Sequence, residues 1–144
     1  LATLNSKSIL FLCTGNSCRS QMADGIANKY LKDHLITSAG TLPEPVNPNA
    51  INALNEISID ISNNKSKKID IDKLNDFDLV ITLCGDAKDK CPVINSNKHI
   101  HWDIPDPAKF QGSEDQIRIE FSRIRDIIYD YIILLKEQLN KDCK

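Results

Sequence analysis

The sequence predicts an α/β fold, a single domain over residues 1–144 in which a doubly wound, four-stranded parallel sheet of order 2-1-3-4 is flanked by helices. Two apolar runs, 7–12 and 78–83, have the length of buried strands, and segments with helical spacing of apolar residues lie between and after them. Strands that alternate with helices form parallel sheets through right-handed crossovers. The simplest such sheet places the two apolar runs side by side.

The first half of the chain supplies two strands and two helices. The strand at 7–12 leads through a short loop into a helix that continues from Ser20, and a second strand is expected at 35–38. After a proline-rich loop, Asn47 and Pro48 are typical of the N-cap and the first residue of a helix.

The second half begins with a polar connection at 62–68, whose lysines are expected on the surface. A short helix is expected at 70–74 and a further strand at 98–102. Ser113 and Gln116 have the spacing of a capping box at the start of a long carboxyl-terminal helix. The apolar residues of that helix step by threes and fours: Ile117, Phe121, Ile124, Ile128, Tyr131 and Leu135.

Charge and composition exclude several classes of function. The net charge of −2 gives no overall basic field, which argues against nucleic-acid binding. No apolar run approaches the ~20 residues that span a bilayer, and the amino end has no secretory pattern. We therefore expect a cytoplasmic monomer without a membrane partner. Five cysteines, an odd number, indicate thiol chemistry better than a disulfide framework.

The loop between the first strand and the first helix is the strongest functional signal. It begins at Cys13 and contains Arg19 just before the helix. Backbone N–H groups, a helix N-terminus and a guanidinium here direct positive charge at one small volume, which predicts an oxyanion site. The residues expected to bind the oxyanion are Thr14, Gly15, Asn16, Ser17, Cys18, Arg19 and Ser20.

Cys13 is the expected nucleophile. A helix N-terminus and an adjacent cation stabilise the thiolate, which is the reactive form of cysteine. The alternative is a small apolar residue at the end of a buried strand, and the arginine six residues later makes that interpretation the weaker one. Cys18 is assigned a structural role.

Cys84 and Cys91 form a second cysteine pair. Cys84 directly follows the strand at 78–83, as Cys13 follows its neighbour, so modest loop adjustment could join the two sulfurs. Cys91 could then attack Cys84 and carry the oxidation outward. A zinc site of four cysteines is the structural alternative, but the spacings lack the usual Cys-x2-4-Cys pattern, and no metal site is expected.

Asp106 is the expected proton donor. It lies between two prolines that stiffen a loop after the last strand, and such a loop can hold one carboxylic acid over the anion. Asp103 is better interpreted as a surface turn residue. The three histidines, His34, His99 and His101, have no ligand spacing and are expected to be structural or exposed.

Taken together, these motifs resemble the thioredoxin-coupled arsenate reductases, which share the fold of low-molecular-weight protein tyrosine phosphatases. The resemblance covers nearly the whole chain. It depends on residues 13–23, 38–40, 60–62, 82–84, 91–92 and 102–108.

The resemblance implies a reaction sequence. Cys13 attacks arsenate while Arg19 and the loop amides hold its oxygens, and Asp106 protonates the departing oxygen. Cys84 then displaces arsenite as a Cys13–Cys84 disulfide forms. Cys91 converts it to a Cys84–Cys91 disulfide that reduced thioredoxin opens. No bound cofactor is implied, and phosphate and sulfate are expected to compete with arsenate.

The main alternative is a phosphatase that hydrolyses phosphoryl esters through a cysteinyl-phosphate on Cys13. Phosphatases of this fold usually have proline at the position of Gln21 and an aromatic residue at the position of Ala108, so the sequence favours the reductase. A non-catalytic zinc or oxyanion-binding module is the third possibility.

One departure concerns potassium. The resemblance implies that some relatives bind this ion with positions matching Asn16, Asp24, Ser38 and Lys67, and with a carboxylate at the last. Because an ammonium cannot ligate a cation, we expect no specific potassium requirement here.

Overall fold

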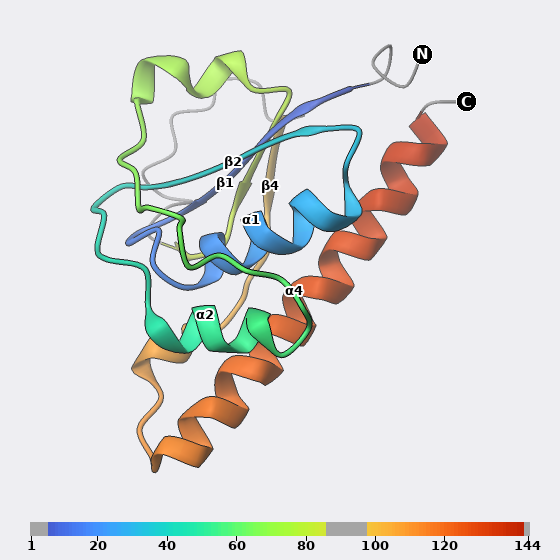
Figure 1. Cartoon of the computed structure of the whole chain (residues 1–144). Helices are drawn as coiled ribbons and strands as arrows, with labels where there is room; N and C mark the ends of the chain where they lie inside the picture. Colours follow the sequence, from blue (N-terminus) through green and yellow to red (C-terminus); the bar gives the residue numbers. More distant parts are fainter. Residues whose placement is uncertain (1–5, 86–97, 143–144) are drawn as a thin grey trace.

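The structure, a computed structural model, describes residues 6–85 and 98–142. Its centre is a parallel sheet in which the strands lie in the order β2-β1-β3-β4 (Figure 1), so the predicted topology is confirmed. The strands are β1 (Ser8–Cys13), β2 (Leu35–Gly40), β3 (Leu79–Thr82) and β4 (His99–His101). The helices among these residues are α1 (Arg19–Tyr30), α2 (Pro48–Asn55), α4 (Glu114–Asp142) and the 3-10 helices η2 (Ile71–Asp76) and η4 (Pro107–Lys109).

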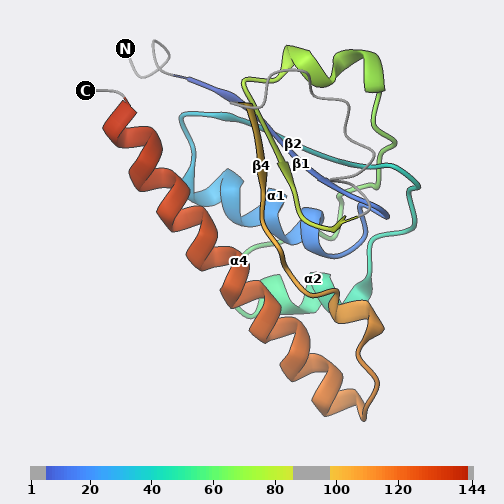
Figure 2. The same ribbon diagram turned by 180° about the vertical axis from the view of Figure 1, so that it is seen from behind.

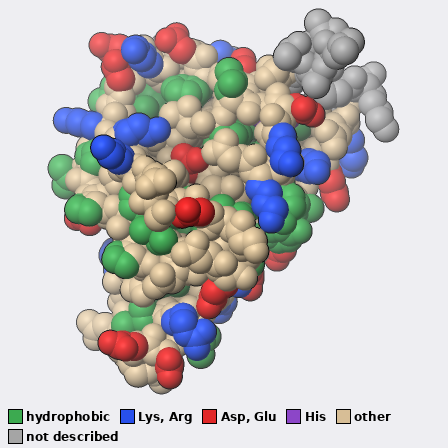
Figure 3. Space-filling model, in the orientation of Figure 1, with side chains coloured by type: hydrophobic (Ala, Val, Ile, Leu, Met, Phe, Trp, Pro, Cys, Tyr) green, Lys and Arg blue, Asp and Glu red, His purple; other side chains and the backbone are tan. Residues whose placement is uncertain are grey.

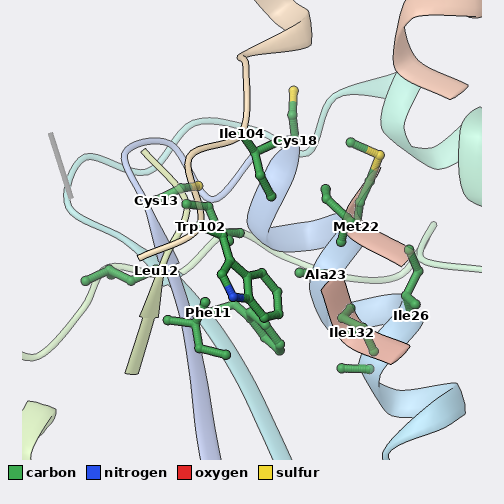
Figure 4. Close-up of a cluster of buried hydrophobic side chains, with 14 of the residues drawn as sticks. Phe11, Leu12, Cys13, Cys18, Met22, Ala23, Ile26, Trp102, Ile104 and Ile132 are labelled. Carbon is green, nitrogen blue, oxygen red and sulfur yellow. The ribbon is translucent and has the colours of Figure 1, made fainter. Parts of the chain in front are cut away.

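A buried apolar cluster anchors the central strand. The Phe11 ring of β1 lies 5.8 Å from the ring of Trp102, which in turn stacks on Tyr131 of α4 at 4.9 Å. Figure 4 shows the cluster continuing past Met22 of α1 to Ile132 of α4. Each such side chain stabilises the fold by about 1.5–3 kcal/mol when fully buried. The strand that ends at Cys13 is therefore fixed in the core.

Two predicted helix starts are confirmed by their caps. Asn47 Oδ1 accepts a hydrogen bond of 2.9 Å from the N–H of Asn49, and Pro48 is the first residue of α2. At the start of α4, Gln116 Oε1 accepts from the Ser113 N–H at 2.9 Å, while Ser113 Oγ accepts from the Gln116 N–H at 3.2 Å. These reciprocal bonds form the predicted capping box.

The long helix α4 ties the helical layer together. It runs past α1 to α2 along the whole molecule (Figure 2) and contacts both helices. Its one buried charged side chain among the described residues is Arg125, whose Nη1 donates to Ala53 O and to Glu56 Oε1, both at 2.8 Å. Arg125 thus satisfies a carbonyl near the end of α2, which the helix itself leaves without a partner.

Some boundaries differ from the predicted ones. β2 continues to Gly40, because that residue still pairs with Cys13 of β1. β4 is shorter than the predicted 98–102. The short helix predicted at 70–74 is a 3-10 helix that begins one residue later, since the Asp70 carboxylate caps it from outside.

The surface agrees with the balanced composition. On the face shown in Figure 3, acidic and basic side chains are interspersed and do not gather into one basic patch. Within residues 6–85 and 98–142, none of the helices combines the length and the apolar character needed to cross a bilayer.

Candidate active site

The loop 14–18 joins β1 to α1 at the carboxyl edge of the parallel sheet, where β2 and β3 lie on either side of β1. Open α/β sheets bind ligands at this kind of topological switch point. The predicted nucleophile, Cys13, is the last residue of β1 and is buried. The loop that follows it can therefore wrap a ligand at the edge of the sheet.

Hydrogen bonds from the segment 41–47 hold the loop from outside. Four loop carbonyl oxygens accept from backbone N–H groups of that segment: Cys13 from Thr41 (3.1 Å), Thr14 from Leu42 (2.8 Å), Gly15 from Glu44 (2.8 Å) and Ser17 from Asn47 (3.0 Å). In a trans peptide the C=O of one residue and the N–H of the next point in opposite directions. The N–H groups of residues 14, 15, 16 and 18 therefore point away from this segment, toward the interior of the loop, where they can donate to an anion.

Gly40 permits the close approach of these two segments. A Cβ atom at this position would overlap the Thr14 carbonyl oxygen and would lie 2.8 Å from the backbone nitrogen of Asn16. Only glycine avoids this collision. The Ser-Ala-Gly sequence at the end of β2 is thus explained by the loop that packs on it.

Asn16 fixes the shape of the loop. Its φ of 48° lies in the left-handed region, which asparagine adopts more readily than most residues. Its buried side chain accepts from the Lys67 backbone N–H (2.9 Å) and from Gln21 Nε2 (3.1 Å), and it donates to Ser20 Oγ (2.8 Å). Ser20 Oγ lies 2.9 Å from Cys13 Sγ. Because the serine oxygen already accepts a hydrogen bond from Asn16 Nδ2, its own proton is available for a hydrogen bond to the sulfur.

Arg19 is held in place by three groups from the far side of the cavity. Its Nη1 donates to Ile104 O (2.9 Å) and Leu83 O (3.3 Å), and its Nη2 lies 3.6 Å from Asp106 Oδ2. Its side chain is 12% exposed. The guanidinium is thus oriented before any ligand arrives, which reduces the entropy lost on binding.

Asp106 is held as well. One carboxylate oxygen, Oδ1, accepts from the Ala108 N–H at 3.0 Å and caps η4, while the other faces Arg19. Its side chain is 24% exposed, whereas the nearby Asp103 is exposed, in agreement with its prediction as a surface turn residue. A carboxyl group so placed can exchange protons with an oxygen in the cavity.

The second predicted sulfur comes from the neighbouring strand. The Leu83 N–H donates to Leu12 O at 2.9 Å, which extends the β1–β3 pairing toward Cys84. Cys84 is buried, and its Sγ lies 3.2 Å from Thr14 Oγ1 in the anion loop. Cys91, the third predicted cysteine, lies outside the described residues.

Cys18 is held in its thiol form. Burial raises the pKa of the Cys18 thiol to about 12, with the charges of Asp106 and Cys13 acting in the same direction. It therefore stays protonated near neutral pH. Its burial agrees with the predicted structural role, although the residue also borders the cavity.

The predicted reactive side chains border one cavity of about 590 Å³. It brings together Cys13 and Arg19 from the two ends of the anion loop, Cys84 from the segment after β3, and Asp106 from the start of η4. Among the described residues, no group of three or more Cys, His, Asp and Glu side chains is arranged to hold a metal ion. The full lining is Cys13, Thr14, Gly15, Ser17, Cys18, Arg19, Glu44, Asn47, Cys84, Gly85, Asp106, Ala108 and Lys109. Asn16 and Ser20 are absent from this lining, so they support the loop from behind.

Some of these contacts were not predicted from the sequence. Glu44 and Lys109 border the cavity, and Gln21 bridges the loop to the polar connection through Asn64 Nδ2 at 3.1 Å. One feature of the sequence could have indicated that Glu44 lies at the cavity. The proline-rich segment that contains it follows β2, so it begins at the same edge of the sheet as the anion loop.

The histidines of β4 have structural contacts. Thr82 Oγ1 lies 2.9 Å from His99 Nε2 and 2.8 Å from His101 Nδ1. His34 Nδ1 accepts from the Lys7 N–H at 3.0 Å.

The positions that the resemblance associates with potassium do not fit that ion. The Asp24 carboxylate accepts hydrogen bonds from Ser38 Oγ (2.7 Å) and Asn28 Nδ2 (2.6 Å). Burial raises the pKa of Asp24, while the Ser38 hydrogen bond and the positive charge of Lys67 oppose that rise. The positive charge of Lys67 thus acts on this carboxylate and opposes the binding of a metal cation there.

The chain is similar to known proteins over most of its length. The family model of the low molecular weight phosphotyrosine protein phosphatases matches residues 8–144. An arsenate reductase of Bacillus subtilis (strain 168) is 53% identical over 127 residues, which are 87% of this chain and 91% of the relative.

Two solved structures have the same fold. One, an arsenate reductase in the phosphate binding state, is 31% identical with a TM-score of 0.72 over 92% of this chain and 98% of its own. The other, the tyrosine phosphatase Wzb from Escherichia coli K30 in complex with sulphate, is 19% identical with a TM-score of 0.80 over 93% of this chain and 99% of its own, and it shows the fold alone. The chain therefore belongs to the low molecular weight phosphotyrosine protein phosphatase family and, within it, to the arsenate reductases.

Proposed function

We propose that this protein reduces arsenate to arsenite through a cysteine nucleophile and a three-cysteine disulfide relay that thioredoxin regenerates, and so detoxifies arsenic. One observation carries the proposal: Cys13 and Cys84, at the ends of adjacent parallel strands, border the same cavity as Arg19. Hydrolysis through a cysteinyl-phosphate needs only the nucleophile, whereas reduction needs a further thiol that can attack the nucleophile's sulfur, the role proposed for Cys84. Relatives of about half identity named arsenate reductase add to this support.

The first step is capture of the anion. Arsenate enters the cavity, and its oxygens accept hydrogen bonds from the N–H groups of loop 14–18 and from the Arg19 guanidinium. Because these donors are already held by the surrounding hydrogen bonds, little reorganisation accompanies binding.

In the second step the Cys13 thiolate attacks arsenic. An As–S bond forms and one As–O bond breaks, and the departing oxygen takes a proton from Asp106 and leaves as water. The Ser20 hydroxyl stabilises the thiolate before the attack. Arsenic remains pentavalent at this stage.

The third step is the reduction. Cys84 loses its proton and attacks the Cys13 sulfur, so that an S–S bond forms and the S–As bond breaks. The electron pair of the broken bond stays on arsenic, which leaves as trivalent arsenite. The two electrons come from the two sulfurs, now oxidised to a Cys13–Cys84 disulfide.

The relay then resets the site. Cys91 attacks Cys84, Cys13 departs as a thiolate, and the dithiol of thioredoxin reduces the Cys84–Cys91 disulfide. Electrons flow in this direction if that disulfide is more oxidising than thioredoxin at about −270 mV. Reduced thioredoxin is maintained in the cytoplasm, where we propose the cycle operates.

A coupled assay tests the cycle. Arsenate-dependent NADPH consumption is measured with thioredoxin and thioredoxin reductase for the wild type and for Cys13→Ser, Cys84→Ser and Cys91→Ser. All three variants should stop turnover. Cys143→Ser, a matched loss of a thiol outside the proposed relay, should turn over normally.

A single-turnover experiment separates the steps. Without thioredoxin, Cys91→Ser should release one arsenite per protein and retain a Cys13–Cys84 disulfide, whereas the other two relay variants should release none. The phosphatase alternative gains support if the wild type releases no arsenite but hydrolyses p-nitrophenyl phosphate, and if Cys84→Ser hydrolyses it equally well.

A further inference from the structure

Glu44 holds a carboxylate at the mouth of the anion cavity. Its backbone N–H donates to Gly15 O at 2.8 Å, so the residue is pinned to the anion loop. Its side chain lies along Gly15, since a Cβ atom built on that glycine would be 3.7 Å from both Glu44 Cβ and Glu44 Oε2. Glu44 is exposed and borders the cavity.

The charges around the cavity make this position distinctive. Arg19 and Lys109 supply positive charge, and Asp106 supplies negative charge that is already paired with Arg19 at 3.6 Å. The Glu44 carboxylate forms no ion pair with any other residue that the structure describes. Among the described residues it is therefore a carboxylate without direct ion pairing, and it lies beside a site built for anions.

The effect of such a charge depends on the charge of the ligand. The repulsion between two charges is proportional to their product, so a doubly charged oxyanion suffers twice the free-energy penalty of a singly charged one. Water and salt weaken the repulsion at an exposed position but do not change this ratio.

We propose that Glu44 is a specificity-determining residue that selects oxyanions by charge and weakens the binding of doubly charged ones. Sulfate and dianionic phosphoryl esters are then disfavoured relative to the monoanion of arsenate, which coexists with the dianion near neutral pH. A phosphoryl ester on a protein would meet the same carboxylate at the mouth of the cavity. The choice of arsenate as the benefiting ligand rests on the proposed function, whereas the selection by charge does not.

The test uses two permanent tetrahedral anions, sulfate with two charges and perchlorate with one. Binding is measured as protection of Cys13 from alkylation by neutral iodoacetamide, quantified by mass spectrometry at constant ionic strength and neutral pH. The proteins compared are the wild type, Glu44→Gln, Glu44→Lys and Glu137→Gln. Glu137 is an exposed residue of α4 and serves as the matched control.

For a separation on the order of 8 Å in water at about 0.1 M salt, loss of the charge should tighten sulfate binding about twofold and perchlorate binding about 1.5-fold. Glu44→Lys changes the charge by two units, so it should roughly square both increases in affinity. A salt concentration of about 1 M should remove most of these increases. Glu137→Gln should change neither affinity.

Equal gains for the two anions, gains that persist in high salt, or no gain would overturn the inference. Melting temperatures of the variants verify that each protein is folded. If the protein reduces no arsenate but the gains scale with charge, the proposed function fails and the role of Glu44 stands. If arsenate is reduced and the gains do not scale with charge, only the role of Glu44 fails.

Discussion

Ser20 Oγ lies 2.9 Å from the sulfur of Cys13, although the two residues belong to different elements, α1 and β1. Asn16 Nδ2 donates to the same oxygen at 2.8 Å, so the serine proton can be donated to the sulfur when Cys13 is the thiolate. The nucleophile is therefore prepared by a hydrogen bond from the first turn of the helix that follows it.

Replacing this hydroxyl tests its contribution. We expect Ser20→Ala to slow alkylation of Cys13 by iodoacetamide about tenfold at neutral pH, because a hydrogen bond to a charged group contributes about 1.5–3 kcal/mol. Arsenate turnover should fall in parallel. Ser122→Ala on α4 is the matched control. If Cys13 of Ser20→Ala is alkylated as fast as Cys13 of the wild type, the hydroxyl does not act on the thiolate.

Cys18 should be unreactive in the folded protein. Burial raises the pKa of its thiol to about 12, so almost none of it is thiolate at pH 8. Alkylation at pH 8 followed by peptide mapping should label Cys13 and leave Cys18 unlabelled until denaturant is added. Labelling of both residues at similar rates would contradict this expectation.

Asp24 should make stability depend on pH. Burial raises its pKa above the ordinary 3.8, against the Ser38 hydrogen bond and the Lys67 charge. The folded protein therefore holds the Asp24 proton more tightly than the unfolded chain, and this stabilisation is complete at low pH and is lost as pH rises through the folded pKa.

Urea unfolding at several pH values measures this effect. The free energy of unfolding of Asp24→Asn, relative to the wild type, should rise between about pH 4 and pH 7. Asp60 is an opposite control, because hydrogen bonds from Ser62 lower its pKa. Asp60→Asn should lose stability relative to the wild type as pH rises through the region at and just below 3.8, so its change should lie at lower pH and have the opposite sign. A flat profile for Asp24→Asn would show that its burial has no such consequence.

Potassium should have no specific effect. The Lys67 charge acts on the Asp24 carboxylate, so a cation bound there would be repelled. The melting temperature and the turnover rate should be the same in KCl as in NaCl at equal concentration. Lys67→Glu removes the repulsion and should bind potassium more strongly than the wild type; a marked preference of the wild type for potassium would contradict the expectation.

The fold class could be predicted because its strongest signals are local. The buried runs that became β1 and β3 are apolar on both faces, and α4 repeats its apolar residues over many turns. The boundaries of the strands were harder to predict. β4 alternates histidine with a single isoleucine and has no buried run, and β2 extends to Gly40 because of its pairing with Cys13.

The same distinction applies to the candidate site. Cys13 and Arg19 share one short loop, so their proximity follows from sequence spacing. The contacts of Glu44 with Gly15 and of Lys67 with Asn16 join residues far apart in the chain, and they depend on how the segment after β2 folds back on the loop. Neither the periodicity of apolar residues nor the spacing of a motif predicts such a tertiary contact.

Segments 41–47 and 66–67 hold loop 14–18 through hydrogen bonds, whereas the second thiol, Cys84, follows β3. Anion capture and electron supply are thus carried by separable parts of the scaffold. Substitutions after β3 can therefore add or remove the redox step while loop 14–18 keeps its shape. One ancestral architecture can in this way diversify into hydrolases and reductases without rebuilding its ligand pocket.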